Sequence, residues 1–330
     1  MPDPTRSQPP KLLQEIRTVL RLHHYSIHTE RAYVEWVVRF IRFHRMRSRA
    51  DLFPAEPKIE AFLTDLAVHG NVAAATQNQA MNALVFLDKR VLKHPLQDRI
   101  NAIRAAKKVT VPVVMTRDEV AAIIALLDGT PQLVAKLLYG SGLRIMEAVR
   151  LRVKDIDYQM RQLTVRSGKG DKDRFTTFPA TLAPLLQNHL VRVKTLHQQD
   201  LAQGHGAVYL PYALERKYPH APKEWGWQYV FPARDVAVDP RSGLTRRHHV
   251  DPSVMNKAIK AAVRRAGLTK PISAHTFRHA FATHLLQRRT DIRTIQQLLG
   301  HNDVTTTMIY THVLQQGGQG VLSPLDDLGV

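Results

Sequence analysis

Apolar residues recur at helical spacing along the first part of the chain. The clearest stripe begins near Ser26 and Thr29 and is formed, at spacings i, i+3, i+4, i+7 and i+8, by Tyr33, Trp36, Val37, Phe40 and Ile41. This spacing is typical of a helix that buries one face. Similar stripes lie in residues 12–20, 59–66 and 80–91, and no strand pattern interrupts them. Residues 9–97 are therefore predicted to form a bundle of four helices.

The helical pattern ends between residues 98 and 115. Pro112 stands there between two valines, and proline is incompatible with a continuing helix. We interpret residues 98–115 as a linker between two domains. A new helix is predicted to begin at Thr116, because Glu119 three residues later completes the pattern of a capping box.

Residues 116–330 combine strand and helix patterns and are predicted to form the second domain. Residues 162–166 and 174–178 have the pattern of two short strands around a glycine-containing turn, which predicts a hairpin. Helices are expected at about 182–197, 252–266, 275–287 and 292–299, the second of them capped by Asp251 with Pro252 in its first turn. The predicted fold is mainly α with a small β component.

The charge balance indicates a polyanionic partner. The chain has 330 residues, with 47 Lys and Arg against 28 Asp and Glu, which gives a formal net charge of +19. Such an excess favours nucleic acid, although a merely basic or ribosome-like protein would share it. Between the apolar stripes of the helical domain lie basic residues that fit a DNA-holding surface, among them Arg31, Arg39, Arg42 and Arg45.

Composition also limits chemistry and location. Cysteine is absent, which excludes disulfides, thiolate nucleophiles and cysteine zinc sites. No apolar run approaches the roughly 18 residues of a membrane span, and residues 1–10 are polar and proline-rich, unlike a signal segment. We expect a cytoplasmic protein without a membrane partner.

Two arginines and a histidine are candidates for holding a phosphodiester, because a guanidinium binds two phosphate oxygens at once and stays charged. Arg144 follows the small residues 140–142, which allow a close approach at a helix start. An ordinary ion pair with Glu147 is the alternative. His275 and Arg278 are three residues apart and share one face of a helix, where a histidine can give or take a proton.

Tyr310 is the candidate nucleophile, and His301 lies shortly before it. The pKa of an unperturbed tyrosine is about 10, so attack at neutral pH needs cations and a base close by. The arginines and histidines would supply them. The alternatives are a core aromatic role for Tyr310 and a surface position for His301, at a helix C-terminus that Gly300 ends.

A lysine at the predicted hairpin tip is the candidate general acid. Lys169, or its neighbour Lys172, would protonate the leaving 5′ oxygen, unless both only touch phosphate. A zinc site is the weaker hypothesis for the histidines. His275 and His279 have the i, i+4 spacing of a zinc helix, but no glutamate follows His275 and the chain has no cysteine. No metal and no cofactor are predicted.

Six of these residues, taken in chain order, resemble the active site of the tyrosine recombinase (phage integrase) family: Arg144, Lys169, His275, Arg278, His301 and Tyr310. The resemblance covers nearly the whole chain. It implies an N-terminal helical core-binding (SAM-like) domain and a mixed α/β catalytic domain. It also implies site-specific DNA strand exchange through a 3′-phosphotyrosyl intermediate, without metal or ATP.

The resemblance implies a role for each of these residues. Arg144 and Arg278 would bind the scissile phosphate, with His301 donating to it. Tyr310 would attack, Lys169 would protonate the leaving oxygen, and His275 would act as an acid/base or phosphate donor.

Within that family the chain is most similar to the integron integrases, which an insertion at about residues 204–231 indicates. This implies integration and excision of gene cassettes at duplex attachment sites and folded single-stranded cassette sites, by a bacterial, nucleoid-associated protein. Family likeness further implies a homotetramer in the synaptic complex, with a tail at about residues 314–330 docking on a neighbour.

The insertion is predicted to contact DNA, because indole rings stack on bases while basic neighbours hold the backbone. A small aromatic core that anchors the loop is an equal alternative. The residues predicted to contact DNA in the insertion, after it and in the linker are Arg216, Lys217, Lys223, Trp225, Trp227, Arg246, Arg247, His248, His249, Lys107 and Lys108.

Three other functions share part of this pattern. A catalytically silent DNA-binding protein of the same fold would bind DNA without a covalent adduct. A type IB topoisomerase would share the chemistry but would relax supercoils without pairing sites. A zinc hydrolase is the remote alternative.

Overall fold

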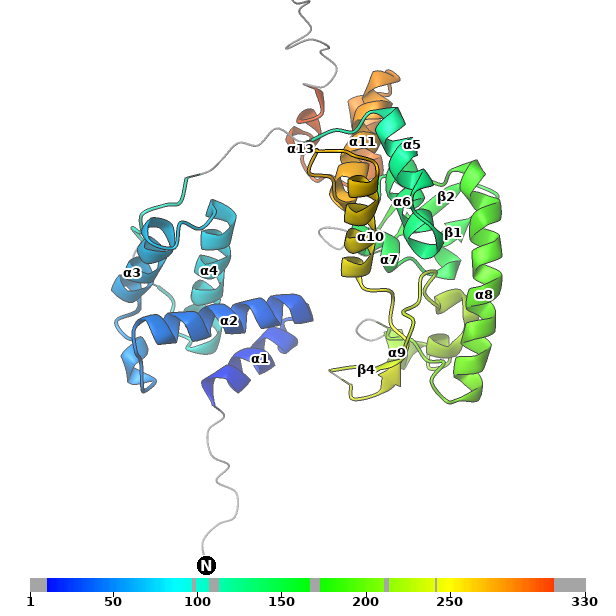
Figure 1. The fold of residues 1–330 in the computed structure, drawn as a ribbon. Helices are drawn as coiled ribbons and strands as arrows, with labels where there is room; N and C mark the ends of the chain where they lie inside the picture. The colour runs from blue at the N-terminus through cyan, green and yellow to red at the C-terminus, as the bar shows by residue number, and fades with distance from the viewer. Residues whose placement is uncertain are drawn as a thin grey trace, which may run out of the picture. The chain divides into compact units, whose positions relative to one another are not determined.

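The chain divides into two compact units, residues 1–110 and 111–330, and each is described by itself. The computed structural model describes residues 11–96, 99–106, 113–166, 173–210, 214–240 and 242–311. Lys107, Lys108, Lys169, Lys172 and the tail at 314–330 lie outside these residues. Figure 1 shows the helices and strands of both units.

The first unit contains the four predicted helices. They are α1 (Leu12–Leu22), α2 (Ile27–Phe43), α3 (Ala55–Val68) and α4 (Ala74–Phe86), with a 3-10 turn at Ala50–Leu52 and a π turn at Leu87–Val91. Ser26 caps α2 by accepting a hydrogen bond from the Thr29 backbone N–H. The predicted apolar faces pack together around Leu20, Phe40 and Leu63. The basic side chains between the stripes point outward, and Arg31, Arg42 and Arg45 are exposed.

The second unit is a helical assembly with two small sheets. Its helices are α5 (Arg117–Ala125), α6 (Gly129–Ser141), α7 (Ile145–Val149), α8 (Ala183–Ala202), α9 (Leu214–Lys217), α10 (Pro252–Arg265), α11 (Ala274–Gln287), α12 (Ile292–Leu299) and α13 (Thr305–Met308). Short 3-10 turns lie at Val153–Asp155, Ala180–Leu182, Ala221–Lys223 and Trp225–Trp227. The capping box of Thr116 and Glu119 and the Asp251 cap are both present, as predicted.

The predicted hairpin is confirmed, and the structure adds strands to it. β1 (Ile156–Asp157), β2 (Gln162–Val165) and β3 (Arg174–Thr177) form an antiparallel sheet in the order β1-β2-β3. A second hairpin, β4 (Ala237–Val238) with β5 (Thr245–Arg246), was not predicted, nor were β1 and α6. The register pairs Val165 with Arg174, which places Arg174 at the end of the hairpin nearest its tip.

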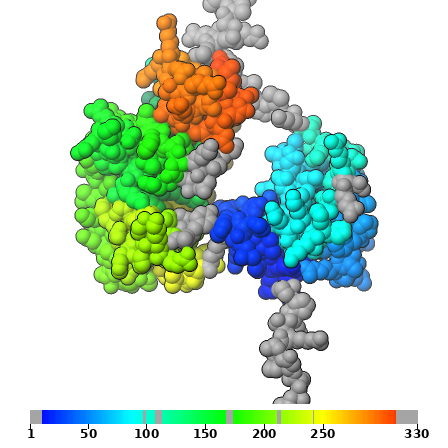
Figure 2. All heavy atoms as spheres, turned by 180° about the vertical axis from the view of Figure 1, so that it is seen from behind, coloured from blue at the N-terminus to red at the C-terminus, as the bar shows by residue number. Residues whose placement is uncertain are grey.

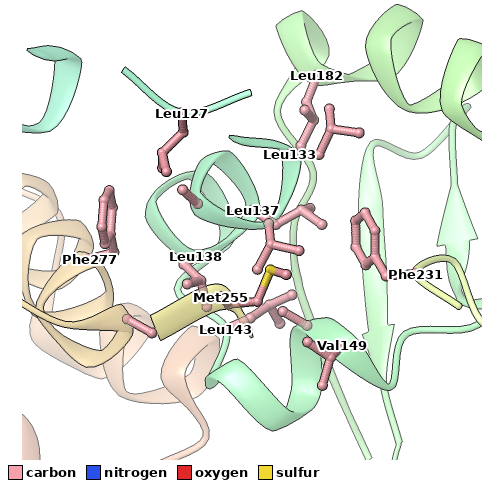
Figure 3. Packing of buried hydrophobic residues seen from close by; sticks show 14 of the residues in the cluster. Leu127, Leu133, Leu137, Leu138, Leu143, Val149, Leu182, Phe231, Met255 and Phe277 are labelled. Carbon is pink, nitrogen blue, oxygen red and sulfur yellow. The ribbon is translucent and has the colours of Figure 1, made fainter. Parts of the chain in front are cut away.

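Helix α6 runs through the core of the second unit. Its Leu133, Leu137 and Leu138 are buried, with Phe277 of α11 on one side and Phe231 on the other (Figure 3). Because Gln132 and Lys136 are the main polar side chains along α6, its sequence lacks the broad polar face by which surface helices are recognised. The helix packs mainly against α11, so it fixes where the first turns of α11 lie.

Gly142 ends α6 and turns the chain toward α7. Its φ is +63°, and a Cβ on it would lie 2.5 Å from the Phe281 ring of α11. Only glycine combines this left-handed backbone with so close an approach. The turn makes Arg144 the residue that precedes α7.

The two ends of the second unit are formed by different helices and strands. In Figures 1 and 2, α12 and α13, orange to red, lie at one end, while α9 and the β4–β5 hairpin, yellow-green to yellow, lie at the other. The predicted insertion is therefore not part of the end that carries Tyr310. Among the described residues, no helix is long and apolar enough to cross a membrane.

Gly142→Ala is expected to lower the free energy of unfolding by about 2–5 kcal/mol, from the left-handed backbone and the collision with Phe281 together. Gly243→Ala is the matched control. Its φ is +71°, but no described atom lies within 4 Å of an added Cβ, so only the backbone cost of about 1–2 kcal/mol remains. Urea unfolding measures both, and equal losses would contradict a tight contact at Gly142.

Candidate active site

Arg278 is buried where three segments of the second unit meet. It lies in the first half of α11 and its side chain is 1% exposed. One terminal nitrogen donates to the Gly142 carbonyl at the end of α6, and the other donates to the Leu299 carbonyl at the end of α12, 2.6 Å away. The guanidinium thus ties α6 and α12 to α11. In this arrangement two donors of the predicted phosphate ligand are already engaged.

Glu147 gathers two more guanidiniums around Arg278. Its carboxylate accepts from the backbone and the side chain of Arg144, both at 2.8 Å, and from Arg174 at 3.0 and 2.6 Å. Arg278 lies 3.9 Å from the same carboxylate. The alternative ion pair for Arg144 is therefore present, yet its side chain remains 26% exposed. Arg144 is thus the most accessible of the three cations.

Arg174 is a site residue that was not predicted. It reaches Glu147 from β3 and also donates to the Leu298 carbonyl, 3.0 Å away. Gly300 permits this approach, because a Cβ there would lie 2.7 Å from the Arg174 side chain. The only sequence signal was an arginine that follows the hairpin turn, and its contacts depend on tertiary packing.

The electrostatics of the cluster favour an anion. Burial opposes the charged form of Glu147, but hydrogen bonds and charges from Arg174 and Arg144 outweigh it and lower the pKa of the carboxyl. Burial and the nearby Arg144 lower the pKa of Arg278 to about 9. Arg278 therefore remains a cation at neutral pH, and three guanidiniums surround one carboxylate, which leaves an excess of positive charge.

His301 links Arg278 to the segment that carries Tyr310. Its Nε2 lies 3.1 Å from Arg278 and its Nδ1 lies 2.9 Å from the Thr307 hydroxyl. Because a guanidinium only donates, Nε2 accepts here and Nδ1–H donates to Thr307. Donation from His301 Nε2 to a phosphate would therefore need a second proton on the ring or a rearrangement. Gly300 ends α12 with φ +63°, as predicted.

Tyr310 is a core aromatic residue, and its hydroxyl also contacts a histidine of the site. Its ring is 2% exposed and packs in a cluster with Phe281 and Leu299. Its hydroxyl nevertheless lies 2.9 Å from His279 Nδ1, and its ring lies parallel to that of His301, 6.5 Å away. In this arrangement the Tyr310 side chain is enclosed by the protein.

The expected activation of the phenol is only partly present. Burial raises the pKa of Tyr310, and the positive charges of Arg278 and Arg144 act in the opposite direction without overcoming it. His275 is exposed, and its ring meets that of His279 edge-on at 4.4 Å. His275 is exposed over part of its surface, but burial of the rest lowers its pKa, and the charges of Arg278 and Arg144 lower it further, so the ring is neutral at pH 7.

The aromatic residues of the predicted insertion are packed against other side chains. The Lys154 ammonium lies 2.7 Å from the ring centre of Trp227. Trp225 packs against the main core and against the His197 ring, and Tyr229 is buried. These contacts favour the anchoring role for Trp225. The Lys154 ammonium covers part of the Trp227 ring.

The basic residues of this region fall into two groups. Arg246 is 2% exposed and hydrogen bonds to Glu215, while Arg247 forms a bidentate pair with Asp200. Both arginines therefore hold the fold together, and contact with DNA stays a prediction for them. The remaining residues are at least partly exposed: Arg216, Lys217, Lys223, His248 and His249. In the part of the chain that the structure describes, no group of three or more histidine, aspartate or glutamate side chains is placed to hold a metal ion.

Both units match known protein families. Residues 113–316 match the phage integrase family, and residues 12–98 match the phage integrase N-terminal SAM-like domain. An integrase/recombinase of Escherichia coli is 49% identical over 320 residues, which cover 96% of this chain and 94% of that protein. Tyrosine recombinase XerD of Agrobacterium fabrum is 31% identical over 277 residues, 79% of this chain and 76% of its own.

Solved structures show the same fold. The Tn1549 transposon integrase in complex with transposon right end DNA superposes with a TM-score of 0.58 at 14% identity, covering 97% of this chain and 98% of that one. The XerH recombinase bound to its difH substrate gives 0.57 at 19% identity, covering 98% and 84%. At such identities the likeness concerns architecture alone.

Glu147→Gln is expected to lower the free energy of unfolding by about 3 kcal/mol at pH 7, because it leaves buried arginines without their counter-charge. Asp173→Asn is the control. Its partner Arg166 lies 3.6 Å away and both side chains are about half exposed, so the loss should stay below about 1 kcal/mol.

The free energy of unfolding that Glu147→Gln removes should depend on pH, which provides a second measurement. The pKa of Glu147 is lower when folded, so its contribution is complete above the unfolded value of about 4.3 and is lost as the pH falls through the folded value. The difference between wild type and E147Q should therefore shrink in acid. A constant difference from pH 7 to pH 3 would contradict the arrangement.

Proposed function

Because the chain belongs to the phage integrase family and is a site-specific tyrosine recombinase, we propose that it cuts and rejoins DNA through Tyr310, which forms a 3′-phosphotyrosyl bond. The observation that carries this proposal is the cluster itself. The Tyr310 hydroxyl lies within the electrostatic influence of Arg144 and Arg278, and both guanidiniums are held by the Glu147 carboxylate or the ends of neighbouring helices. A phenol beside two candidate phosphate ligands is the set of groups that a phosphotyrosyl transfer requires.

The scissile phosphate first meets the exposed part of Arg144 and the exposed ring of His275. Arg278 joins when the phosphate oxygens replace the carbonyls that its guanidinium now contacts, since a guanidinium binds an anionic oxygen more strongly than a neutral carbonyl oxygen. Tyr310 then turns from its apolar packing to attack, and Lys169 or Lys172 protonates the leaving 5′ oxygen. Stabilising the charge on the pentavalent phosphorus by cations already in position is the main catalytic term.

The two units act on DNA together in this proposal. We keep the division into a core-binding domain at 9–97, a linker at 98–115 and a catalytic domain at 116–330. The exposed arginines of α2 and of the turn after it, together with Lys107 and Lys108, hold the DNA backbone. Four copies pair two sites in a synapse, with the tail at 314–330 reaching a neighbour. The protein works at the bacterial nucleoid.

We further propose that the substrates are integron recombination sites. One is a duplex attachment site and the other is a folded single-stranded cassette site. Support comes from the exposed cations Arg216, Lys217 and Lys223 beside the aromatic segment at 225–229. Trp227 is the ring best placed to take an extrahelical base, on the part of its surface that Lys154 leaves open. Trp225 anchors the segment.

A catalytically silent DNA-binding protein is the second candidate. The 2% exposure of Tyr310 favours it, because a sealed phenol cannot attack. The intact set of cations around the phenol argues for catalysis. Formation of a covalent adduct separates the two functions.

Tyr310→Phe is expected to abolish the covalent protein–DNA adduct on a suicide-nicked attachment site while site affinity stays within about twofold, because the hydroxyl contributes to attack and little to binding. Tyr158→Phe is the matched control, since within the described residues its buried hydroxyl has no hydrogen-bond partner. Denaturing gels measure the adduct and mobility shifts measure affinity. An adduct that survives in Y310F would assign the attack to another residue.

Trp227→Ala is expected to reduce recombination of folded single-stranded sites about tenfold more than recombination of duplex sites, since stacking on a base is worth about 1–3 kcal/mol. Parallel recombination assays with both site types, at equal protein concentration, measure the ratio. An equal loss on both would show that the ring only supports the fold.

A further inference from the structure

We propose that His279 is a catalytic residue of this site, and that its Nδ1 accepts the phenol proton of Tyr310 when the oxygen attacks phosphorus. This role rests on the proposed function, because it takes Tyr310 as the nucleophile. The observation that carries it is the 2.9 Å separation between His279 Nδ1 and the Tyr310 hydroxyl, a contact that the proposal requires the hydroxyl to keep when the ring leaves its apolar packing.

The position of His279 connects the buried phenol to the open part of the site. It directly follows Arg278 on α11 and lies one turn after His275. Its ring centre is 5.4 Å from that of Tyr310 and 4.4 Å from that of His275. Tyr310 is buried, His279 is partly exposed and His275 is exposed. Helix α11 therefore carries Arg278 as the proposed phosphate ligand, His279 at the phenol and His275 at the surface.

The protonation state of His279 suits an acceptor. Burial, with the nearby His275 and Arg278, lowers its pKa to about 4, so the ring is neutral at pH 7 and one nitrogen carries a lone pair. A phosphodiester held by Arg144 and Arg278 adds a negative charge beside the ring. That charge stabilises the imidazolium and raises the pKa of His279. The ring thus becomes a better base only when substrate is in place.

The proton transfers balance in both directions. In cleavage, the bond between the Tyr310 oxygen and phosphorus forms, the bond from phosphorus to the 5′ oxygen breaks, and the phenol proton moves to His279. The ammonium of Lys169 or Lys172 protonates the 5′ oxygen. In rejoining, a 5′ hydroxyl attacks the phosphotyrosine and returns its proton to the lysine. His279 gives its proton back to the departing Tyr310 oxygen.

His275 and His279 therefore have separate tasks. The sequence favoured His275 for the acid/base role, but the histidine nitrogen within hydrogen-bond distance of the phenol belongs to His279. His275 faces outward, where it serves the phosphate. His279 is the partner of the nucleophile.

The test is the single-turnover rate of adduct formation on a suicide-nicked attachment site. His279→Asn keeps an acceptor oxygen near the position of Nδ1 but cannot take a proton, and it is expected to slow the reaction about 100-fold. Site affinity and thermal stability should match wild type. His279→Gln, whose longer side chain moves the amide outward, is the second variant in the same measurement of adduct formation.

Fluorinated tyrosine at position 310 separates proton transfer from packing. Its phenol is more acidic and needs less help from a base, so it should restore most of the rate to H279N while changing the rate of the parent chain little. A rate for H279N within about twofold of wild type would overturn the proposal. So would a deficit that fluorination leaves unchanged, which would mark His279 as a packing residue. A wild-type chain that forms no adduct would instead overturn the proposed function, and this role with it.

Discussion

One buried carboxylate holds the site together. Glu147 accepts hydrogen bonds from Arg144 before α7 and from Arg174 on β3, and it lies 3.9 Å from Arg278 on α11. Without it, three like charges would repel one another in a poorly screened interior. The main-chain carbonyls of Gly142 and Leu299 complete the arrangement by fixing Arg278. The three guanidiniums are thus held close together around one carboxylate.

The same contacts keep the site closed. Arg278 is engaged with carbonyls, His301 accepts from Arg278, and Tyr310 packs among apolar side chains. In the proposed reaction each of these contacts exchanges for one with the phosphate before attack. Binding and chemistry would then be separable steps, with a movement of the segment around α13 between them.

Periodicity and capping patterns predicted most of the fold, because amphipathic helices and their caps are local properties of a sequence. They missed α6, whose polar face is reduced to Gln132 and Lys136, and the two-residue strands, which are too short to alternate. The order of Arg144, His275, Arg278, His301 and Tyr310 suggested a site, and the structure brings Arg144, Arg278, His301 and Tyr310 close together, while their roles stay a prediction. The partners could not be predicted: Arg174 reaches Glu147 through a hairpin register, and Arg246 and Arg247 pair with distant carboxylates. His279 was considered only as a zinc ligand, because its neighbour across space is far away in the chain.

The most direct measurement is the position of the scissile phosphorus in a structure of the chain on attachment-site DNA with an uncleaved phosphate. We expect nonbridging oxygens on Arg144 and Arg278, and the Tyr310 oxygen about 3–3.5 Å from phosphorus, in line with the 5′ oxygen. A phosphate bound elsewhere, or a Tyr310 ring still packed among Phe281 and Leu299 with DNA fully engaged, would contradict this expectation.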